Sequence, residues 1–319
     1  MRGLIVLVIV VLLPFGCSGR LAGTDFVDAY PIELDPSDPA RTDVGRLRFV
    51  GGLELRSRDP RFGGFSSMAL SPDGAGLTIL SDRAVRFEAT LAHNSDGTLA
   101  GARFRDGAAL LPGLAASQRR TLDSEAMVRL PNGDIVVGFE HHHRVLRFPG
   151  GWKEQPAVVS APDGIAGLPA NGGLESLALL HDGRLVMIAE EGEGGLTSVW
   201  LGGPGAWDKA SYVLEGYFRP TDAAVLPSGD LLVLERRFTW VGGIAARLVR
   251  IATADLRPGA RIGGQEVARL ERPLAVDNFE AIAVHPLRPG EVAVYLLSDD
   301  NFNVLQRTLL MEFILLDQP

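Results

Sequence analysis

After about residue 45 the chain alternates short apolar runs with turns that contain glycine, and one layout recurs five times. Each copy begins with a small or acidic residue and continues as an apolar strand, a polar turn, a second apolar strand and an acid. Two apolar strands joined by such a turn predict a β-hairpin. The copies are FSSMALSPDGAGLTILSD (65–82), SEAMVRLPNGDIVVGFE (124–140), LESLALLHDGRLVMIAE (174–190), TDAAVLPSGDLLVLE (221–235) and FEAIAVHPLRPGEVAVYLLSDD (279–300).

The repeat spacing predicts the fold. Matching positions in successive copies lie 47 to 59 residues apart, which leaves room for two more strands after each hairpin, for example 143–149 and 156–161. Repeats of this length with four strands each are typical of a β-propeller. We therefore predict an all-β chain with five blades, and a sixth blade within 82–122 stays open as an alternative. The last repeat lacks a strand, which 46–55 would supply by pairing with 308–315, closing the ring and covering its exposed edge.

Composition agrees with one propeller domain over residues 45–319. The chain has 319 residues with 38 Gly and 20 Pro, so turns are frequent, and its 46% hydrophobic content is ample for a core. Its net charge of −8 argues against nucleic acid as a partner. A cation, or a small anionic substrate delivered with a cation, fits that charge, and we expect a monomer.

The first residues are typical of an export signal. Met1-Arg2 supplies a positive end, and Leu4 to Leu13 form an apolar run too short to span a bilayer. The only cysteine, Cys17, follows at the place where bacterial lipoproteins are acylated. We predict a lipoprotein signal over 1–16, with a plainly cleaved signal or an uncleaved anchor as alternatives. Residues 17–44 are predicted to form an extended tether. The domain would then be periplasmic, or membrane-anchored and facing the periplasm, with Cys17 as its only link to a membrane.

The hairpins predict that acids gather at one end of the ring. In a propeller blade the innermost strand starts, and the second strand ends, at the same rim. Crowded carboxylates repel one another unless a cation joins them, and Ca²⁺ prefers six to eight oxygen ligands. The alternative is that each acid caps a strand or pairs with an arginine. The candidate metal ligands are Glu125, Glu175, Asp222, Glu280, Asp299 and Asp300.

Basic residues follow several of these acids and are candidates for binding an anionic substrate. They are Arg83, His142, Arg236 and Arg237. Arginine binds a phosphate or carboxylate through two oxygens at once, although local ion pairs would explain the same residues. The run 141–143 contains three histidines, but a zinc site would need further ligands that the sequence does not supply. No GxSxG motif and no phosphate-binding GxxxxGK[ST] loop is present.

Several segments of the chain resemble the bacterial phytase-like family named for the esterase-like activity of phytase. They are DSEAM, GLESLALL, PTDAAVLPSGDLLVLERRF, DNFEAIAV and LLSDDNFNVLQRTLLMEF, within residues 45–316. The resemblance implies a propeller that hydrolyses a phosphate or related ester, similar to the calcium-dependent propeller phytases. The chain departs from those phytases in lacking their lysine-rich phosphate site, because its rim cations are arginines.

These observations give a working hypothesis of an exported, calcium-dependent hydrolase of a small anionic ester. Water activated by the cation would attack the ester, with Glu125, Glu175 and Glu280 as catalytic residues that bind the cation or accept a proton. Arg236 or Arg237 would hold the anion. Two alternatives remain: a lactone hydrolase of the gluconolactonase type, and a non-enzymatic envelope lipoprotein that binds a partner with its propeller face.

Overall fold

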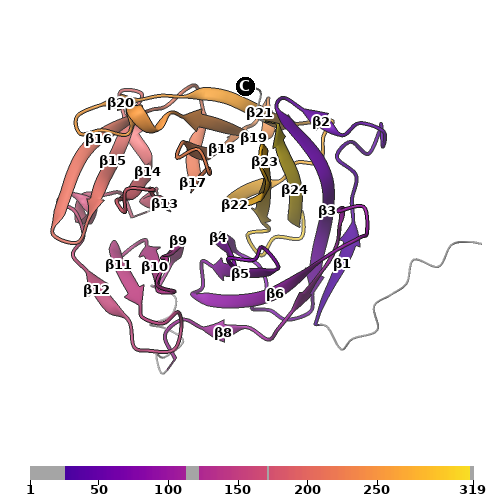
Figure 1. Cartoon of the computed structure of the whole chain (residues 1–319), viewed down its shortest axis with the longest axis horizontal. Helices are drawn as coiled ribbons and strands as arrows, with labels where there is room; N and C mark the ends of the chain where they lie inside the picture. Colours follow the sequence, from indigo (N-terminus) through magenta and orange to yellow (C-terminus); the bar gives the residue numbers. More distant parts are fainter. Residues whose placement is uncertain (1–25, 113–121, 171, 317–319) are drawn as a thin grey trace, which may run out of the picture.

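The computed structural model describes residues 26–112, 122–170 and 172–316, and it shows five antiparallel sheets arranged around a central axis (Figure 1). The predicted all-β propeller of five blades is confirmed. Within those ranges the helical structure consists of two short 3-10 turns, η1 (Ile165–Gly167) and η2 (Thr253–Asp255). Over the same residues, none of the helices has the length and apolar character needed to cross a bilayer. The predicted signal segment 1–16 and Cys17 lie outside the described residues.

The inner strands of each blade are consecutive in the sequence, with the first of them innermost. The first blade contains β4 (Phe65–Leu70), β5 (Gly76–Ser81), β6 (Val85–His93), β7 (Leu99–Phe104) and β8 (Ala108–Ala109). The second contains β9 (Ser124–Arg129), β10 (Ile135–Phe139), β11 (Arg144–Phe148) and β12 (Ala157–Val159). The third contains β13 (Leu174–Leu179), β14 (Leu185–Glu193), β15 (Leu196–Gly203), β16 (Ala206–Val213) and the short β20 (Arg261–Ile262).

The fourth and fifth blades complete the ring. The fourth contains β17 (Arg219–Val225), β18 (Leu231–Thr239), β19 (Gly243–Ile251) and β21 (Gln265–Glu271). The fifth contains β22 (Asn278–Arg288), β23 (Glu291–Asp299) and β24 (Thr308–Leu316), followed outward by the N-terminal strands β3 (Leu47–Ser57), β1 (Val27–Pro31) and β2 (Asp43–Val44). Segment 82–122, where a sixth blade was considered, supplies β6, β7 and β8 of the first blade in its described part.

The N-terminal strand β3 pairs antiparallel with the C-terminal strand β24, so both ends of the propeller domain share one blade. Residues 27–44, which the sequence analysis treats as a tether, are extended but pack against the propeller. Their strand β1 pairs with β3, and Val27 and Leu34 are buried. The backbone groups at the outer edge of β3 are thereby covered by a further strand, which protects an edge that could otherwise pair with another chain.

Five apolar clusters hold the blades together, and each lies between two neighbouring sheets. One joins the first and second blades around Leu80 and Phe139, and another joins the fifth and first blades around Leu53 and Phe65. Equivalent clusters fill the other three interfaces. The alternation of the strands therefore buries both faces of every inner sheet, and the ring is stabilised at each interface by apolar contacts.

A β-bulge occurs near the start of the innermost strand of every blade. In the second blade, for example, Ser124 pairs with Phe139 and Ala126 with Gly138, so Glu125 has no partner on β10. A bulge adds one residue to one strand and redirects its side chain. We call the end of the axis where these bulges lie the mouth. The bulged residues are Ser66, Glu125, Glu175, Thr221 and Glu280.

The contact between β3 and β24 predicts how a core substitution will act. Leu53 is fully buried in the cluster between the fifth and first blades, and truncation of such a leucine costs about 2–5 kcal/mol. Leu53→Ala should therefore lower the free energy of unfolding by about that amount in urea denaturation. Leu287→Ala removes a half-exposed leucine near the end of β22 and serves as the control. Equal effects of the two substitutions would contradict this account of ring closure.

Candidate active site

The bulges place three glutamates in the mouth. Glu125, Glu175 and Glu280 are the extra residues of β9, β13 and β22, and each is half-buried between its blade and the axis. The hairpin register also brings the end of the second strand to the same rim, because Asn278 at the start of β22 pairs with Asp299 at the end of β23. The predicted convergence of strand starts and second-strand ends is therefore present in the backbone pairing.

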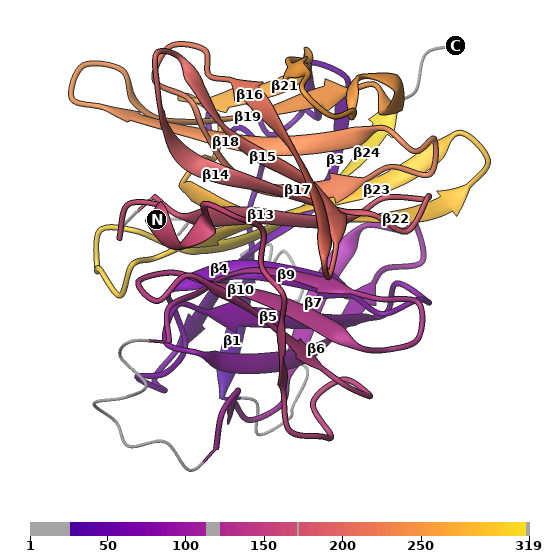
Figure 2. The same cartoon turned by 90° about the vertical axis from the view of Figure 1, so that its left-hand side faces the viewer.

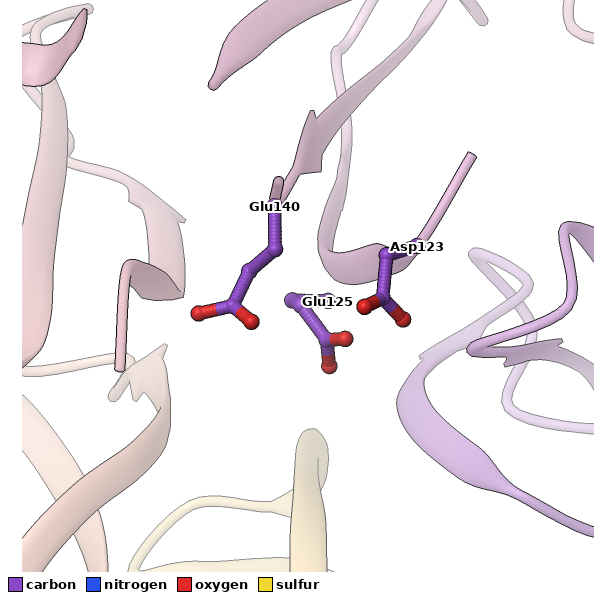
Figure 3. Close-up of side chains that lie close together, drawn as sticks. All are labelled: Asp123, Glu125 and Glu140. Atoms are coloured by element: carbon purple, nitrogen blue, oxygen red, sulfur yellow. The ribbon is translucent and has the colours of Figure 1, made fainter. Parts of the chain in front are cut away.

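Asp123, Glu125 and Glu140 form the tightest group of carboxylates. One oxygen from each lies within 4.8 Å of the others, and Figure 3 shows the three groups turned toward a common region. Asp123 precedes β9 and Glu140 follows β10, so a single hairpin supplies all three. Glu140 is buried and is positioned by the next blade, since its Oε1 accepts the backbone N–H groups of Gly172 (3.0 Å) and Gly173.

Repulsion between neighbouring carboxylates extends around the whole mouth. Asp82 interacts with Asp123, Asp123 with Glu125, and Glu125 with Glu175. Glu175 interacts in turn with Glu280, Glu280 with Asp299, and Asp299 with Asp82, so these six acids, here called the acidic ring, form a closed circuit. Two carboxylates about 5 Å apart repel by about 3 kcal/mol at an effective dielectric constant of about 20.

Burial and this repulsion together raise the pKa values of several acids of the mouth. Burial is the larger cause of the raised pKa values of Glu125, Glu175 and Asp299, and neighbouring carboxylates raise them further. Burial raises the pKa of Asp82 to about 6, with Asp123 adding to the shift. The pKa of Glu280 is raised to about 7 by burial, although Arg236 acts against that shift.

Arg236 is the cation that touches the acidic ring. Its Nε lies 2.9 Å from Glu280 Oε1, and its Nη2 lies 3.0 Å from Glu190 Oε1. Asn278 Nδ2 donates to the same Glu280 oxygen at 2.7 Å, which fixes the Glu280 carboxylate against Arg236. Glu280 is the main cause of the raised pKa of Arg236, which stays charged. The mouth therefore has a side with excess negative charge, around Asp123, Glu125 and Glu140, and a side where a guanidinium faces the axis.

The cluster of three carboxylates on the negative side of the mouth has the chemistry of a cation site. Its donors are oxygen atoms, which suit hard divalent cations such as Ca²⁺, Mg²⁺ or Mn²⁺. A bound cation would replace mutual repulsion by attraction at the three carboxylates of Figure 3. Asp123 also has His141 Nε2 at 3.0 Å from its Oδ2, so this histidine can orient the carboxylate.

Two predicted metal ligands have other partners. The fourth-blade bulge falls on Thr221, one residue before the predicted Asp222. Asp222 is buried, and its two oxygens accept the N–H groups of Ala223 (2.8 Å) and Ile282 (2.9 Å), which joins the fourth and fifth blades. Its assignment as a metal ligand therefore has no support from the geometry. Asp300 accepts N–H groups from Gly64 (3.1 Å) and Phe302 (3.0 Å) and so connects two loops at the mouth.

The four predicted substrate-binding residues also differ in whether they face the acidic ring or have other surroundings. Arg236 faces the acidic ring, whereas Arg237 pairs with Glu271 at 3.3 Å and lies against the ring of Phe218. Arg83 is exposed, with its guanidinium 3.2 Å from the centre of the Phe302 ring. His142 is exposed in the loop after β10. Of the four predicted substrate-binding residues, Arg236 forms ion pairs with carboxylates of the mouth, and Arg83 interacts with the adjacent Asp82 of the acidic ring.

The sequence analysis did not include Asp123 or Glu140 among the metal ligands, although both flank the repeated hairpin. The available signal was that the second repeat, DSEAM to VVGFE, carries an acid on each side of the bulged Glu125. Glu235, which ends the equivalent hairpin of the fourth blade, points elsewhere: it is fully buried and binds Tyr212 (2.7 Å) and Arg247. An acid at the end of the second strand therefore reaches the mouth in some blades only.

The raised pKa values predict how stability varies with pH in the absence of divalent cations. The pKa values of Glu280 (about 7) and Asp82 (about 6) exceed their usual values of 4.5 and 3.8, so the folded state binds these protons more tightly than the unfolded state. Their contribution to stability is present below the unfolded pKa and is lost as pH rises through the folded pKa. The Tm measured in EDTA should thus fall by a few degrees between about pH 4 and about pH 7.

Asp82→Asn is the matched variant for this measurement, because it removes one titrating group while it keeps an oxygen for Ser81. Its Tm should fall less steeply with pH than that of the parent chain. Acids with lowered pKa values, such as Asp134, act below about pH 4 and lie outside this window. A Tm in EDTA that rises steadily through this range would refute the predicted protonation of the mouth.

Comparison with solved structures found similar proteins at low sequence identity. Solved structures with similar folds include a protein provisionally described as a gluconolactonase (13% identity, 95% of this chain and 94% of that chain covered, TM-score 0.46). Others are virginiamycin B lyase from Staphylococcus aureus (9%, 90% and 99%, TM-score 0.42) and a protein of unknown function from Bacteroides caccae (15%, 80% and 84%, TM-score 0.43). At these values the likeness carries no information about chemistry. No curated protein matches the chain.

The family comparison is more specific. The model described as "Phytase-like: Esterase-like activity of phytase" matches residues 60–302, which span all five bulged positions and the whole acidic ring. The resemblance noted in the sequence is thereby confirmed. The chain belongs to this phytase-like family of β-propellers.

Proposed function

We propose that the protein is an exported, calcium-dependent hydrolase of a small anionic ester, with a phosphate-type ester as the leading substrate class. The observation that carries the proposal is the mouth, where the carboxylates of Asp123, Glu125 and Glu140 lie close together and the guanidinium of Arg236 pairs with Glu280 of the acidic ring. The family description supports ester hydrolysis. The apolar run Leu4 to Leu13 and the following Cys17 support export.

Calcium is the proposed cation because the candidate ligands are carboxylates, three from the β9–β10 hairpin and a fourth, Glu175, from the next blade. Ca²⁺ accepts six to eight oxygens in flexible geometry, and Asp123, Glu125 and Glu140 would supply its first ligands. Glu175 lies beside them and interacts with both Glu125 and Glu140. A bound divalent cation would lower the pKa of coordinated water and polarise an ester oxygen.

The residues of the chain have distinct roles in this proposal. Glu175 is the general base, because burial and neighbouring carboxylates raise its pKa and so make its carboxylate a stronger acceptor for a proton of the attacking water. Arg236 binds the anionic oxygens of the substrate. Glu280 and Glu190 position the guanidinium through their contacts at 2.9 and 3.0 Å. The carboxylate group and Arg236 thus act on opposite parts of one small substrate.

The cation site predicts a stabilisation that depends on Glu125. Calcium should raise the Tm of the parent chain, because binding to the folded state alone adds to its stability. Glu125→Gln should weaken calcium binding at least about tenfold, as measured by titration calorimetry. Glu193→Gln alters an exposed acid at the tip of the β14–β15 hairpin and should leave the affinity unchanged. Equal affinities in both variants would place any bound calcium elsewhere.

The hydrolytic proposal is tested with a panel of phosphomonoesters, phosphodiesters, carboxyl esters and lactones, with calcium or EDTA. One of the phosphate esters should be turned over, and EDTA should abolish that turnover. Loss of a general base typically costs about 10²–10⁴ in rate, so Glu175→Gln should reduce kcat by that factor while Glu193→Gln does not. Turnover that is restricted to lactones would favour the gluconolactonase-type alternative. If no compound is hydrolysed, the hydrolase proposal fails.

A further inference from the structure

Exposed apolar side chains gather at one end of the molecule. Within the described residues, the large hydrophobic side chains with high exposure include three on the β18–β19 hairpin: Phe238 (58% exposed), Trp240 (95%) and Val241 (102%). Val304 (99%) and Leu305 (86%) lie on the loop between β23 and β24, and Tyr217 (72%) precedes β17. We call these six residues the apolar loops. The other exposed residues of this kind are scattered: Tyr30 in β1, Val158 in β12 and Leu287 near the end of β22.

The apolar loops all lie on the mouth face. The β18–β19 and β23–β24 connections each follow the second strand of a blade, and second strands end at the mouth. Tyr217 lies just before the innermost strand β17, which begins there. The two blades are neighbours that share an apolar cluster. In Figure 2, β22 and β24 run from left to right, so the mouth face lies on the left. The apolar loops therefore stand beside the acidic ring, on one side of it.

The N-terminal segment enters the propeller at the same face. Strand β3 ends at the mouth, and β1 is antiparallel to it, with Val27 paired to Ser57. The described structure therefore begins at the mouth face. Eight residues lie between Cys17 and Phe26, so that stretch can span at most about 30 Å. The apolar run Leu4 to Leu13 and the apolar loops would thus act from the same side of the molecule.

We infer that the mouth face docks on a lipid bilayer, with the apolar loops inserted at the interface between head groups and acyl chains. Four of these side chains, at the tips of the hairpins, are 86–102% exposed: Trp240, Val241, Val304 and Leu305. A deformable apolar phase accommodates such protruding tips, and tryptophan favours the membrane interface. Phe238 packs edge to face against Trp240, with ring centres 5.9 Å apart, so the hairpin presents one apolar unit. The N-terminal segment reaching the same face favours a bilayer over a protein partner.

Trp240 is a built-in reporter for this docking. Of the four tryptophans, Trp200 is buried, and Trp152 after β11 and Trp207 at the start of β16 are half-buried at the end away from the mouth. The full chain is mixed with phosphatidylcholine vesicles whose acyl chains are brominated or unmodified. We expect the tryptophan emission to shift to shorter wavelength and to be quenched by the brominated lipid. Both effects should disappear in Trp240→Phe, which keeps an apolar side chain but removes the fluorophore.

Measurements of vesicle binding distinguish the contribution of the apolar loops from that of the N-terminal segment. The double substitution of Trp240→Ser and Val241→Ser should weaken vesicle binding about tenfold or more, because the apolar area it removes is lost from the docked state. Val158→Ser and Leu287→Ser, on other surfaces, should have no effect. Absence of bromolipid quenching overturns the inference, even if the chain still floats with vesicles through its N-terminus. In that outcome the apolar loops would instead fit a protein partner.

Discussion

The β-bulge that opens every inner strand is the constraint on which the site depends. A regular strand sends alternate side chains to the two faces of its sheet, where the apolar clusters between blades receive them. The bulge interrupts this alternation at one residue per blade and frees its side chain from both faces. Where that residue is glutamate, as in the second, third and fifth blades, it reaches the axis. Where it is Ser66 or Thr221, the hydroxyl binds backbone carbonyl oxygens and joins neighbouring blades.

Two opposing interactions act within the propeller: apolar contacts between blades and repulsion between the carboxylates of the mouth. The apolar clusters bind the blades together, and this holds the acidic ring in a geometry that its own charges oppose. Arg236 relieves the repulsion on one side, through Glu280 and Glu190. On the other side, Asp123, Glu125 and Glu140 have His141 and the backbone of Gly172 and Gly173 as partners, and these leave most of the negative charge in place. Because the apolar clusters hold the scaffold without help from a cation, the three carboxylates stay in position to bind one.

The sequence predicted the features that depend on local chemistry. Turn residues and alternating apolar positions identified the five hairpins, and their common register identified Glu125, Glu175 and Glu280. It could not predict features set by pairing across strands. Asp222 and Thr221 are adjacent, and only the register with β18 decides which of them is bulged. Arg236 and Arg237 are adjacent too, and they face opposite sides of β18, so one contacts the acidic ring and the other Glu271. Glu140 reaches the mouth and Glu235 does not, because a tyrosine and an arginine of neighbouring strands bind Glu235.

The loops at the mouth differ from the turns at the opposite end of the propeller, and they surround both the acidic ring and the apolar loops. Short turns such as 131–134 and 227–230 close the hairpins at the end away from the mouth, whereas the connections between second and third strands at the mouth vary in length from two residues, 194–195, to eight, 300–307. The β14–β15 tip is acidic, with Glu191 and Glu193, and the β18–β19 tip next to it is apolar. A propeller fixes the inner strands but leaves the mouth loops free to differ from blade to blade. One blade can therefore present carboxylates to the axis while its neighbour presents an apolar tip beside them. If that tip enters a bilayer, the acidic ring lies close to the lipid surface, and a substrate would reach it from the gap between the loops and the membrane.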